Sequence, residues 1–234
     1  MYFIHNIKYK YENEGNSSLS YYSNNNTKKI IENIQDSIMA VVSDFMEYPD
    51  KYLTESDVRC FLFNKLMDND LLNCPMPTSD RSKSIPVHTE VRWYGNEGKL
   101  KYRSDMVIIE TPDLITKGNK VFMLPSKGFG FNKFNAIIEI KLRRTNGESD
   151  RNFIEKIKYD VEKLIRIEND VVKAGTQYAS FVFILDKKNE NNNMHNLIEN
   201  EFFTHQKYHP EMDLFICYAS PLILSRSVSA DNKF

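Results

Sequence analysis

The chain has 234 residues, of which 41% are hydrophobic and 27% are charged, proportions typical of a globular protein. This length predicts one sizeable domain or two small ones, and no run approaches the roughly 18 apolar residues that span a bilayer. The first residues lack a continuous apolar stretch, so we expect no signal peptide. Cys60, Cys74 and Cys217 are too few and too scattered for a disulfide framework, which suits a cytoplasmic protein with no membrane partner.

The charge distribution is more informative than the net charge of −1. Residues 117–173 contain thirteen Lys or Arg against eight Asp or Glu, so this segment carries +5 while the rest of the chain is acidic. A basic segment of this kind suits a local phosphate-binding surface. A lysine-rich helix face exposed to solvent would give the same count.

The first half of the chain predicts an arm, two helices and two strands. Residues 1–29 are predicted to form an N-terminal arm or loop, because 11–29 are rich in Asn, Ser and Tyr without a clear period. Helical spacing follows over residues 28–47, and a second helix begins after Thr54, which forms a capping-box pattern with Asp57. Strands are predicted over 87–94 and 99–110, and residues 111–133 are predicted to be an irregular insertion.

The second half alternates strands and helices. We predict strands over 134–143, 178–185 and 212–218, a long amphipathic helix over 150–171, and a helix around 194–204. This order predicts one α/β domain over residues 30–234, with a central mixed sheet of about five strands flanked by helices.

Two charges interrupt the apolar strand predicted over 134–143. The period of two gives this strand an apolar face, Ala136, Ile138, Ile140 and Leu142, and a second face with Ile137, Glu139, Lys141 and Arg143. Asp105 lies in the preceding strand, and it would lie beside Glu139 if the two strands pair. Two neighbouring carboxylates repel each other, and Mg²⁺ with its oxygen ligands would relieve that repulsion. Alone, Glu139 and Lys141 would be interpreted as an exposed ion pair on a half-solvated strand, because such E-x-K triplets are frequent.

Lys141 and Glu55 extend this candidate site. The Lys141 ammonium, close to a metal carboxylate, would orient or acidify an attacking water, or stabilise negative charge on a phosphate. Glu55 lies in the first turn of the second helix, beside its packed stripe, where a metal-bound water or a basic side chain would satisfy it. The helix dipole favours an acid at this position whatever its role.

Three other groups are weaker candidates. Glu90 shares a strand face with His88 and Arg92, and it either joins the site or lies on an exposed strand face. The histidines at 195, 205 and 209 lack the spacing of a metal site. The loop over 126–134 alternates lysines with Phe129, Phe131 and Phe134, which either stack on nucleic acid or pack inward.

Together, ESDVR (55–59), YRSDMVIIE (102–110) and IIEIK (137–141) resemble the PD-(D/E)XK nuclease superfamily, which has the restriction-endonuclease-like fold. The resemblance covers about residues 50–186. It implies that Asp105, Glu139 and the main-chain carbonyl of Ile140 bind the metal, that Lys141 is the catalytic lysine, and that Glu55 is an accessory acid. The chain departs from the family where Arg103-Ser104 replaces the motif's proline, and in the 34-residue interval between Asp105 and Glu139.

The implied function is that of a hydrolase, an endonuclease that uses Mg²⁺, or Mn²⁺ in its place, to cleave phosphodiester bonds in DNA. RNA stays open as a substrate, and a homodimer stays open as the assembly. The alternative is a non-catalytic module on the same fold, which binds nucleic acid or a protein. The residues predicted to contact nucleic acid are Lys127, Lys133, Arg143, Arg144, Lys158 and Lys163.

Overall fold

The computed structural model describes residues 2–6, 25–94, 98–116, 125–126, 129–171, 177–188, 193–204 and 212–221. A six-stranded mixed sheet in the order β1-β10-β9-β8-β5-β4 forms its centre. The strands are β1 (Tyr2–Asn6), β4 (Val87–Tyr94), β5 (Leu100–Ile109), β8 (Phe134–Arg143), β9 (Ala179–Asp186) and β10 (Asp213–Ala219). The β8, β9 and β10 strands run parallel, whereas β4–β5, β5–β8 and β1–β10 are antiparallel pairs.

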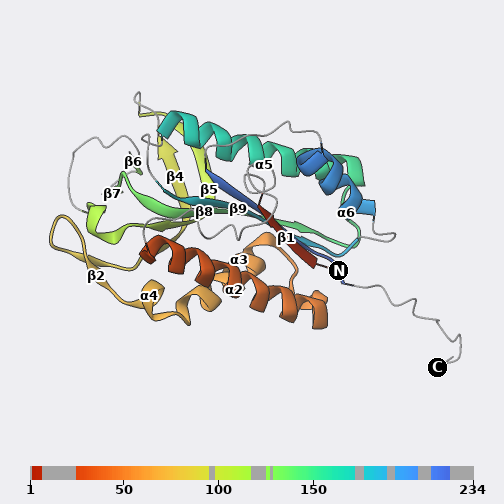
Figure 1. Cartoon of the computed structure of the whole chain (residues 1–234), viewed down its shortest axis with the longest axis horizontal. Coiled ribbons are helices and arrows are strands. Elements are labelled where there is room, and N and C mark those ends of the chain that lie inside the picture. Colours follow the sequence, from red (N-terminus) through yellow and green to blue (C-terminus); the bar gives the residue numbers. More distant parts are fainter. Residues whose placement is uncertain are drawn as a thin grey trace, which may run out of the picture.

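Helices cover both faces of this sheet (Figure 1). One layer consists of α2 (Asn25–Glu47), α3 (Glu55–Met67) and the short α4 (Asp70–Asn73). The opposite layer consists of α5 (Asp150–Val171), α6 (Asn193–Ile198) and the π-helical turn η4 (Glu199–Thr204). The α/β class and the flanking helices confirm the prediction from the sequence.

Short elements connect these layers. The 3-10 turns η2 (Pro49–Lys51) and η3 (Thr111–Asp113) follow α2 and β5. Two small antiparallel sheets pair β2 (Met76–Pro77) with β3 (Lys83–Ser84), and β6 (Pro125–Ser126) with β7 (Phe129–Gly130). Part of the predicted insertion over 111–133 therefore contains regular structure, and its residues 117–124 and 127–128 lie outside the described part of the chain.

The alternation along β8 separates two hydrophobic cores. Ala136, Ile138 and Ile140 pack with the α2 and α3 side chains, as the predicted apolar face requires. Ile137, on the other face, packs with the apolar stripe of α5. All eight residues of β9 are buried, as expected for a strand covered by helices on both faces.

The β5 and β8 strands pair over only part of their length. The register runs from Ile109↔Phe134 to Met106↔Ile138, and it ends there. Residues of β5 before Met106 pair with β4, whereas β8 continues past Ile138 in parallel with β9. We call the point where the β5–β8 pairing ends the fork, and Asp105 and Glu139 are the first residues beyond it.

One prediction about the N-terminal end of the chain is corrected, and the structure decides between the two alternatives for the phenylalanines of the inserted loop. Residues Tyr2–Asn6 form a sixth strand, paired with β10, where the sequence indicated an arm and about five strands. Residues 7–24 of that predicted arm lie outside the described residues. Phe131 and Phe134 pack edge-on against the buried Trp93, so these rings belong to the core and cannot stack on a ligand.

In the part of the chain that the structure describes, no helix has both the length and the apolar character that a membrane span requires.

Candidate active site

At the fork, the carboxylates of Asp105 and Glu55 accept the β8 main-chain hydrogen bonds that a neighbouring strand would otherwise accept. The main-chain N–H of Ile140 donates to Oδ2 of Asp105 at 2.8 Å, and that of Leu142 points to Oε1 of Glu55 at 3.5 Å. These two N–H groups alternate along the edge of β8 that β5 no longer covers. Because an unpaired backbone donor is costly, Asp105 and Glu55 stabilise this open edge. The fork is thus lined by acids for a structural reason as well as any chemical one.

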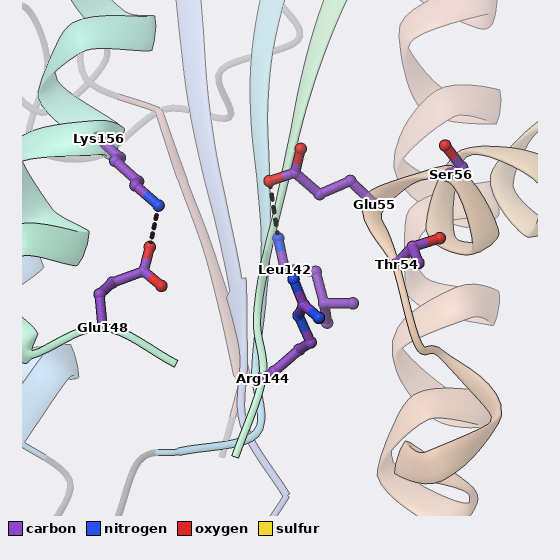
Figure 2. Close-up of a pocket in the computed structure, with 7 residues that line it drawn as sticks. All are labelled: Thr54, Glu55, Ser56, Leu142, Arg144, Glu148 and Lys156. Atoms are coloured by element: carbon purple, nitrogen blue, oxygen red, sulfur yellow. Dashed lines mark hydrogen bonds and ion pairs between the residues drawn. The ribbon is translucent and has the colours of Figure 1, made fainter. Parts of the chain in front are cut away.

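The N-terminus of α3 determines where Glu55 lies. Thr54 caps the helix, because its side chain accepts a hydrogen bond from the Asp57 N–H, and the Asp57 side chain accepts one from the Thr54 N–H. This confirms the predicted capping box. Glu55 is the first residue of the helix, and Figure 2 shows its side chain reaching the main chain of β8 at Leu142.

Glu55, Lys141, Asp160, Lys163 and Glu139 form a continuous series of ionic contacts, which we call the charge chain. Lys141 Nζ lies 3.9 Å from Glu55 Oε1 and 2.7 Å from Asp160 Oδ2. Lys163 Nζ lies 3.2 Å from Asp160 Oδ1 and 2.7 Å from Glu139 Oε2. The strand supplies Glu139 and Lys141, and α5 supplies Asp160 and Lys163. Three carboxylates therefore alternate with two ammonium groups.

Glu139 is the most unusual member of the charge chain. It is 1% exposed, and its Oε1 has no hydrogen-bond partner among the described residues. Burial raises the pKa of Glu139 to about 8; Lys163 opposes this rise, and the charges of Asp160 and Asp105 add to it. The carboxylate is therefore short of positive charge. The interpretation of Glu139 and Lys141 as an exposed ion pair is wrong, because Glu139 is buried and Lys141 contacts Glu55 and Asp160.

Both lysines of the charge chain stay protonated. Burial alone would lower the pKa of Lys141, but Asp160 and Glu55 outweigh it and raise the pKa above its usual value. Burial likewise opposes the charge of Lys163, and Glu139 with Asp160 raises its pKa. An ammonium in this state stabilises negative charge, and it is a poor acceptor of a proton from water.

On the other side of the fork, two arginine side chains form ion pairs with Glu90 and Asp105. Arg59, from α3, forms ion pairs with Glu90 and, at 3.3 Å, with Oδ1 of Asp105. Arg103 reaches the second oxygen of Glu90 at 3.1 Å. Glu90 has a φ of 55°, in the left-handed region that is uncommon for a non-glycine residue within a strand. Glu90 is therefore connected to Asp105 through Arg59. This contact supports the alternative in which Glu90 joins the site.

Sequence reasoning missed Asp160 and Arg59. Asp160 is buried, and it lies three residues after Ile157 and four before Leu164, within the apolar stripe of α5. A carboxylate within such a stripe was an available signal, because a buried acid needs a partner. Arg59 had no comparable signal, since its role depends on which acids of β4 and β5 the fold brings within its reach.

The predicted metal ligands all offer oxygen atoms, the donor type that hard cations prefer. Asp105 and Glu139 are close enough for the Asp105 charge to raise the pKa of Glu139, and Glu139 offers an unpartnered oxygen. The Ile140 carbonyl, at the fork, accepts a hydrogen bond from Lys141 at 3.3 Å. No group of three or more His, Cys, Asp and Glu side chains suited to a metal occurs among the described residues. Two carboxylates and a carbonyl suit Mg²⁺, which keeps several waters.

The residues predicted to contact nucleic acid lie in different environments. Arg143 is fully buried and bound by Asp186 and Asp150, so we withdraw it from that set. Lys163 contacts Glu139 and Asp160, and Lys158 pairs with Glu155 and Glu201. Lys127 lies outside the described residues.

Lys133 and Arg144 are the remaining predicted contacts, and they lie at opposite ends of β8 and so do not form one surface. Lys133, Arg144 and Arg151 are exposed, and none of their side chains has an acidic partner in the described part of the chain. Arg144 also lines a pocket of about 290 Å³ between α3 and the start of α5. Thr54, Glu55, Ser56, Leu142, Glu148 and Lys156 complete its lining (Figure 2). The pocket adjoins the charge chain, because Glu55 belongs to both.

No match was found in comparisons with protein-family models, with curated proteins or with solved structures.

Proposed function

We propose that the protein is a metal-dependent nuclease with a restriction-endonuclease-like core that hydrolyses phosphodiester bonds in DNA. The observation that carries this proposal is the fork. Asp105 and Glu139 are the first residues beyond the last β5–β8 pair, and Lys141 follows on the same face as Glu139. An acid on one strand and an acid-x-lysine on its neighbour give the arrangement that the superfamily motif describes.

The acids of the fork would hold the metal. Asp105, Glu139 and the Ile140 carbonyl supply the oxygen donors, and the unpartnered Oε1 of the buried Glu139 supports this assignment. Bound Mg²⁺ supplies Lewis-acid chemistry, which polarises a phosphodiester and lowers the pKa of water.

Lys141 would stabilise the negative charge that develops on the phosphate. Its raised pKa keeps it cationic, which favours this role over proton removal from water. Asp160 and Glu55 hold its ammonium from two sides. In the reaction, the oxygen of water bonds to phosphorus and the bond to one sugar oxygen breaks. One proton of the water goes to that sugar oxygen and the other is released from the product phosphate.

The proposal is tested with closed circular DNA, which reports a single nick. We expect the purified protein to nick it with Mg²⁺ or Mn²⁺ and not with EDTA. Lys141→Met should slow the reaction by about 10²–10³-fold, as loss of a preorganised charge does. The matched control is Lys65→Met, which removes an exposed lysine on α3 whose ion pair in the described structure is with Asp68. No cleavage of DNA or RNA by the folded protein, or an unchanged rate in Lys141→Met, would contradict it.

The second candidate is a non-catalytic binding module on the same fold. The observation in its favour is that both acids of the fork already have cationic partners, Arg59 for Asp105 and Lys163 for Glu139. Such a module would bind DNA equally well in Mg²⁺ and in EDTA, would leave it intact, and would give no heat of metal binding in calorimetry.

A further inference from the structure

The Lys163 ammonium is surrounded by oxygen atoms. Its Nζ lies 2.7 Å from Glu139 Oε2, 3.2 Å from Asp160 Oδ1 and 3.3 Å from the main-chain oxygen of Arg103. These contacts come from three elements, β8, α5 and β5. An ammonium has three N–H donors, and three oxygens are within reach of it.

This environment is the one that a hard metal cation prefers. Two carboxylates and a carbonyl are oxygen ligands of the types that bind Mg²⁺ and Ca²⁺. The Oε1 atom of Glu139 adds a fourth oxygen, buried and without a partner in the described structure. Without the ammonium, Glu139 and Asp160 would be two nearby carboxylates with Lys141 as their remaining cation, and Lys141 contacts only Asp160 of the two.

The side chain of Lys163 is also able to leave. Lysine carries a compact charge on a flexible four-carbon stem, and it makes no bidentate contact that would fix its geometry. Its side chain is largely buried but keeps an exposed fraction of 11%, so it is not closed off from solvent. By contrast, the buried Arg143 on the same face of β8 is fixed to Asp186 by two hydrogen bonds.

We propose that Glu139, Asp160 and the Arg103 carbonyl form a second cation position beside the Asp105–Glu139 pair, that Lys163 is its resident cation, and that a divalent ion enters by displacing Lys163. The inference rests on the proposed function, which brings a divalent ion to Glu139. It adds a ligand, Asp160, that the superfamily resemblance does not supply. It also gives Lys163 a role other than contact with nucleic acid.

The first test measures Mn²⁺ binding by calorimetry to the wild-type protein and to Lys163→Met. Removing the resident cation should tighten binding by about tenfold or more, which corresponds to about 1.4 kcal/mol. The matched control is Lys158→Met, which removes the same charge from the same helix, where its partners are Glu155 and Glu201. It should leave Mn²⁺ affinity unchanged. Equal or weaker binding by a folded Lys163→Met would overturn the proposal.

The second test uses the wild-type protein, so it does not depend on the stability of a variant. Lysines are methylated with formaldehyde and cyanoborohydride, with and without saturating Mn²⁺, and the sites are mapped by mass spectrometry. Labelling of Lys163 should rise several-fold with Mn²⁺, while labelling of Lys158 stays constant. Unchanged or reduced labelling of Lys163 at saturating Mn²⁺ contradicts displacement.

The two proposals fail in different ways. If the wild-type protein binds Mn²⁺ and cleaves DNA while Lys163 stays protected, displacement is wrong and the nuclease proposal stands. If only Lys163→Met binds Mn²⁺, Lys163 excludes the ion from the wild-type protein, so displacement is wrong and the metal-dependent function fails with it. If neither protein binds Mn²⁺, the metal site and its displacement are both wrong.

Discussion

Two buried charged networks begin on the same face of β8, only a few residues apart, and they differ in how completely they are satisfied. Arg143 forms two hydrogen bonds with Asp186, at 2.7 and 2.5 Å, and a third with Asp150. Both oxygens of Asp186 accept further bonds, one from the Lys188 N–H and one from the Tyr218 hydroxyl. The Arg143 guanidinium also lies over the aromatic ring of Phe153. This network is complete.

The charge chain at Glu139 is incomplete by the same criteria. It contains three carboxylates and two ammonium groups, it leaves Oε1 of Glu139 without a partner in the described structure, and it raises the pKa of that carboxyl. A complete buried network fixes one conformation, whereas an incomplete one retains affinity for a further cation. The difference assigns Arg143 to the fold, and it supports the proposal that Glu139 binds a cation.

The largest expected effect comes from breaking the complete network. Arg143→Met leaves Asp186 buried without its cation, so the free energy of unfolding should fall by about 3–5 kcal/mol in urea denaturation. Arg144→Met is the matched control, because the next residue is exposed and has no acidic partner among the described residues. It should change stability by less than about 0.5 kcal/mol. Similar losses in both variants would show that Arg143 contributes little.

The next effect is a pH dependence that the incomplete network predicts. Since the pKa of Glu139 is raised to about 8 in the folded state, the folded protein holds this proton more tightly than the unfolded chain. Stability from this group is therefore present at low pH and is lost as the pH rises towards 8. Relative to Glu139→Gln, the wild-type free energy of unfolding should fall by up to about 1.4 kcal/mol per pH unit. A constant difference from pH 5 to 8 would exclude the raised pKa.

A smaller effect is expected from the acid that links the two lysines. Asp160→Asn keeps the shape of the side chain but weakens its hold on Lys141, so nicking of DNA should slow by about 10–100-fold. Its control is Glu162→Gln, which removes an exposed acid from the same helix. If Asp160 serves stability alone, its loss should lower the melting temperature without changing the rate at a temperature where the variant is folded.

The smallest effect concerns the helix end that positions Glu55. Thr54→Ala removes the cap of α3 and should cost about 1 kcal/mol of stability. Because Glu55 contacts the site at its periphery, the cleavage rate should fall only a few-fold. A large loss of activity with no loss of stability would assign Thr54, which also lines the pocket beside Glu55, a direct role with the substrate.

Local periodicity was enough to predict most of the fold. The helices around Glu55 and over 150–171, and the strands over 87–94 and 134–143, agree with the structure because their apolar residues follow a helical or strand period. The β1 strand was missed because Tyr2–Asn6 has only five residues without alternation of apolar and polar side chains, and its partner is more than two hundred residues away in sequence. No local pattern reports such a pairing.

The site was predictable only in part. The residues at Asp105, Glu139 and Lys141 were identified from charges within apolar strands, and the structure brings them to one fork. Their actual partners were not predicted, because Asp160, Lys163 and Arg59 come from helices whose packing the sequence does not specify. Arg143 was misjudged for the same reason. A basic residue near a strand end is expected to face solvent or phosphate. The acids that bury Arg143, Asp150 and Asp186, come from a helix and a strand later in the chain, so the local sequence does not reveal them.

The pairing of β1 with β10 has a consequence for the order of folding. Tyr2 pairs with Ala219, so β1 has no partner until β10, more than two hundred residues later, has been synthesised. Loop-closure entropy makes such distant contacts slow to form. The β5–β8 hairpin-like pair and the α5 crossover to β9 close much shorter loops. We therefore expect the fork to assemble early on the nascent chain, and the far edge of the sheet to close last.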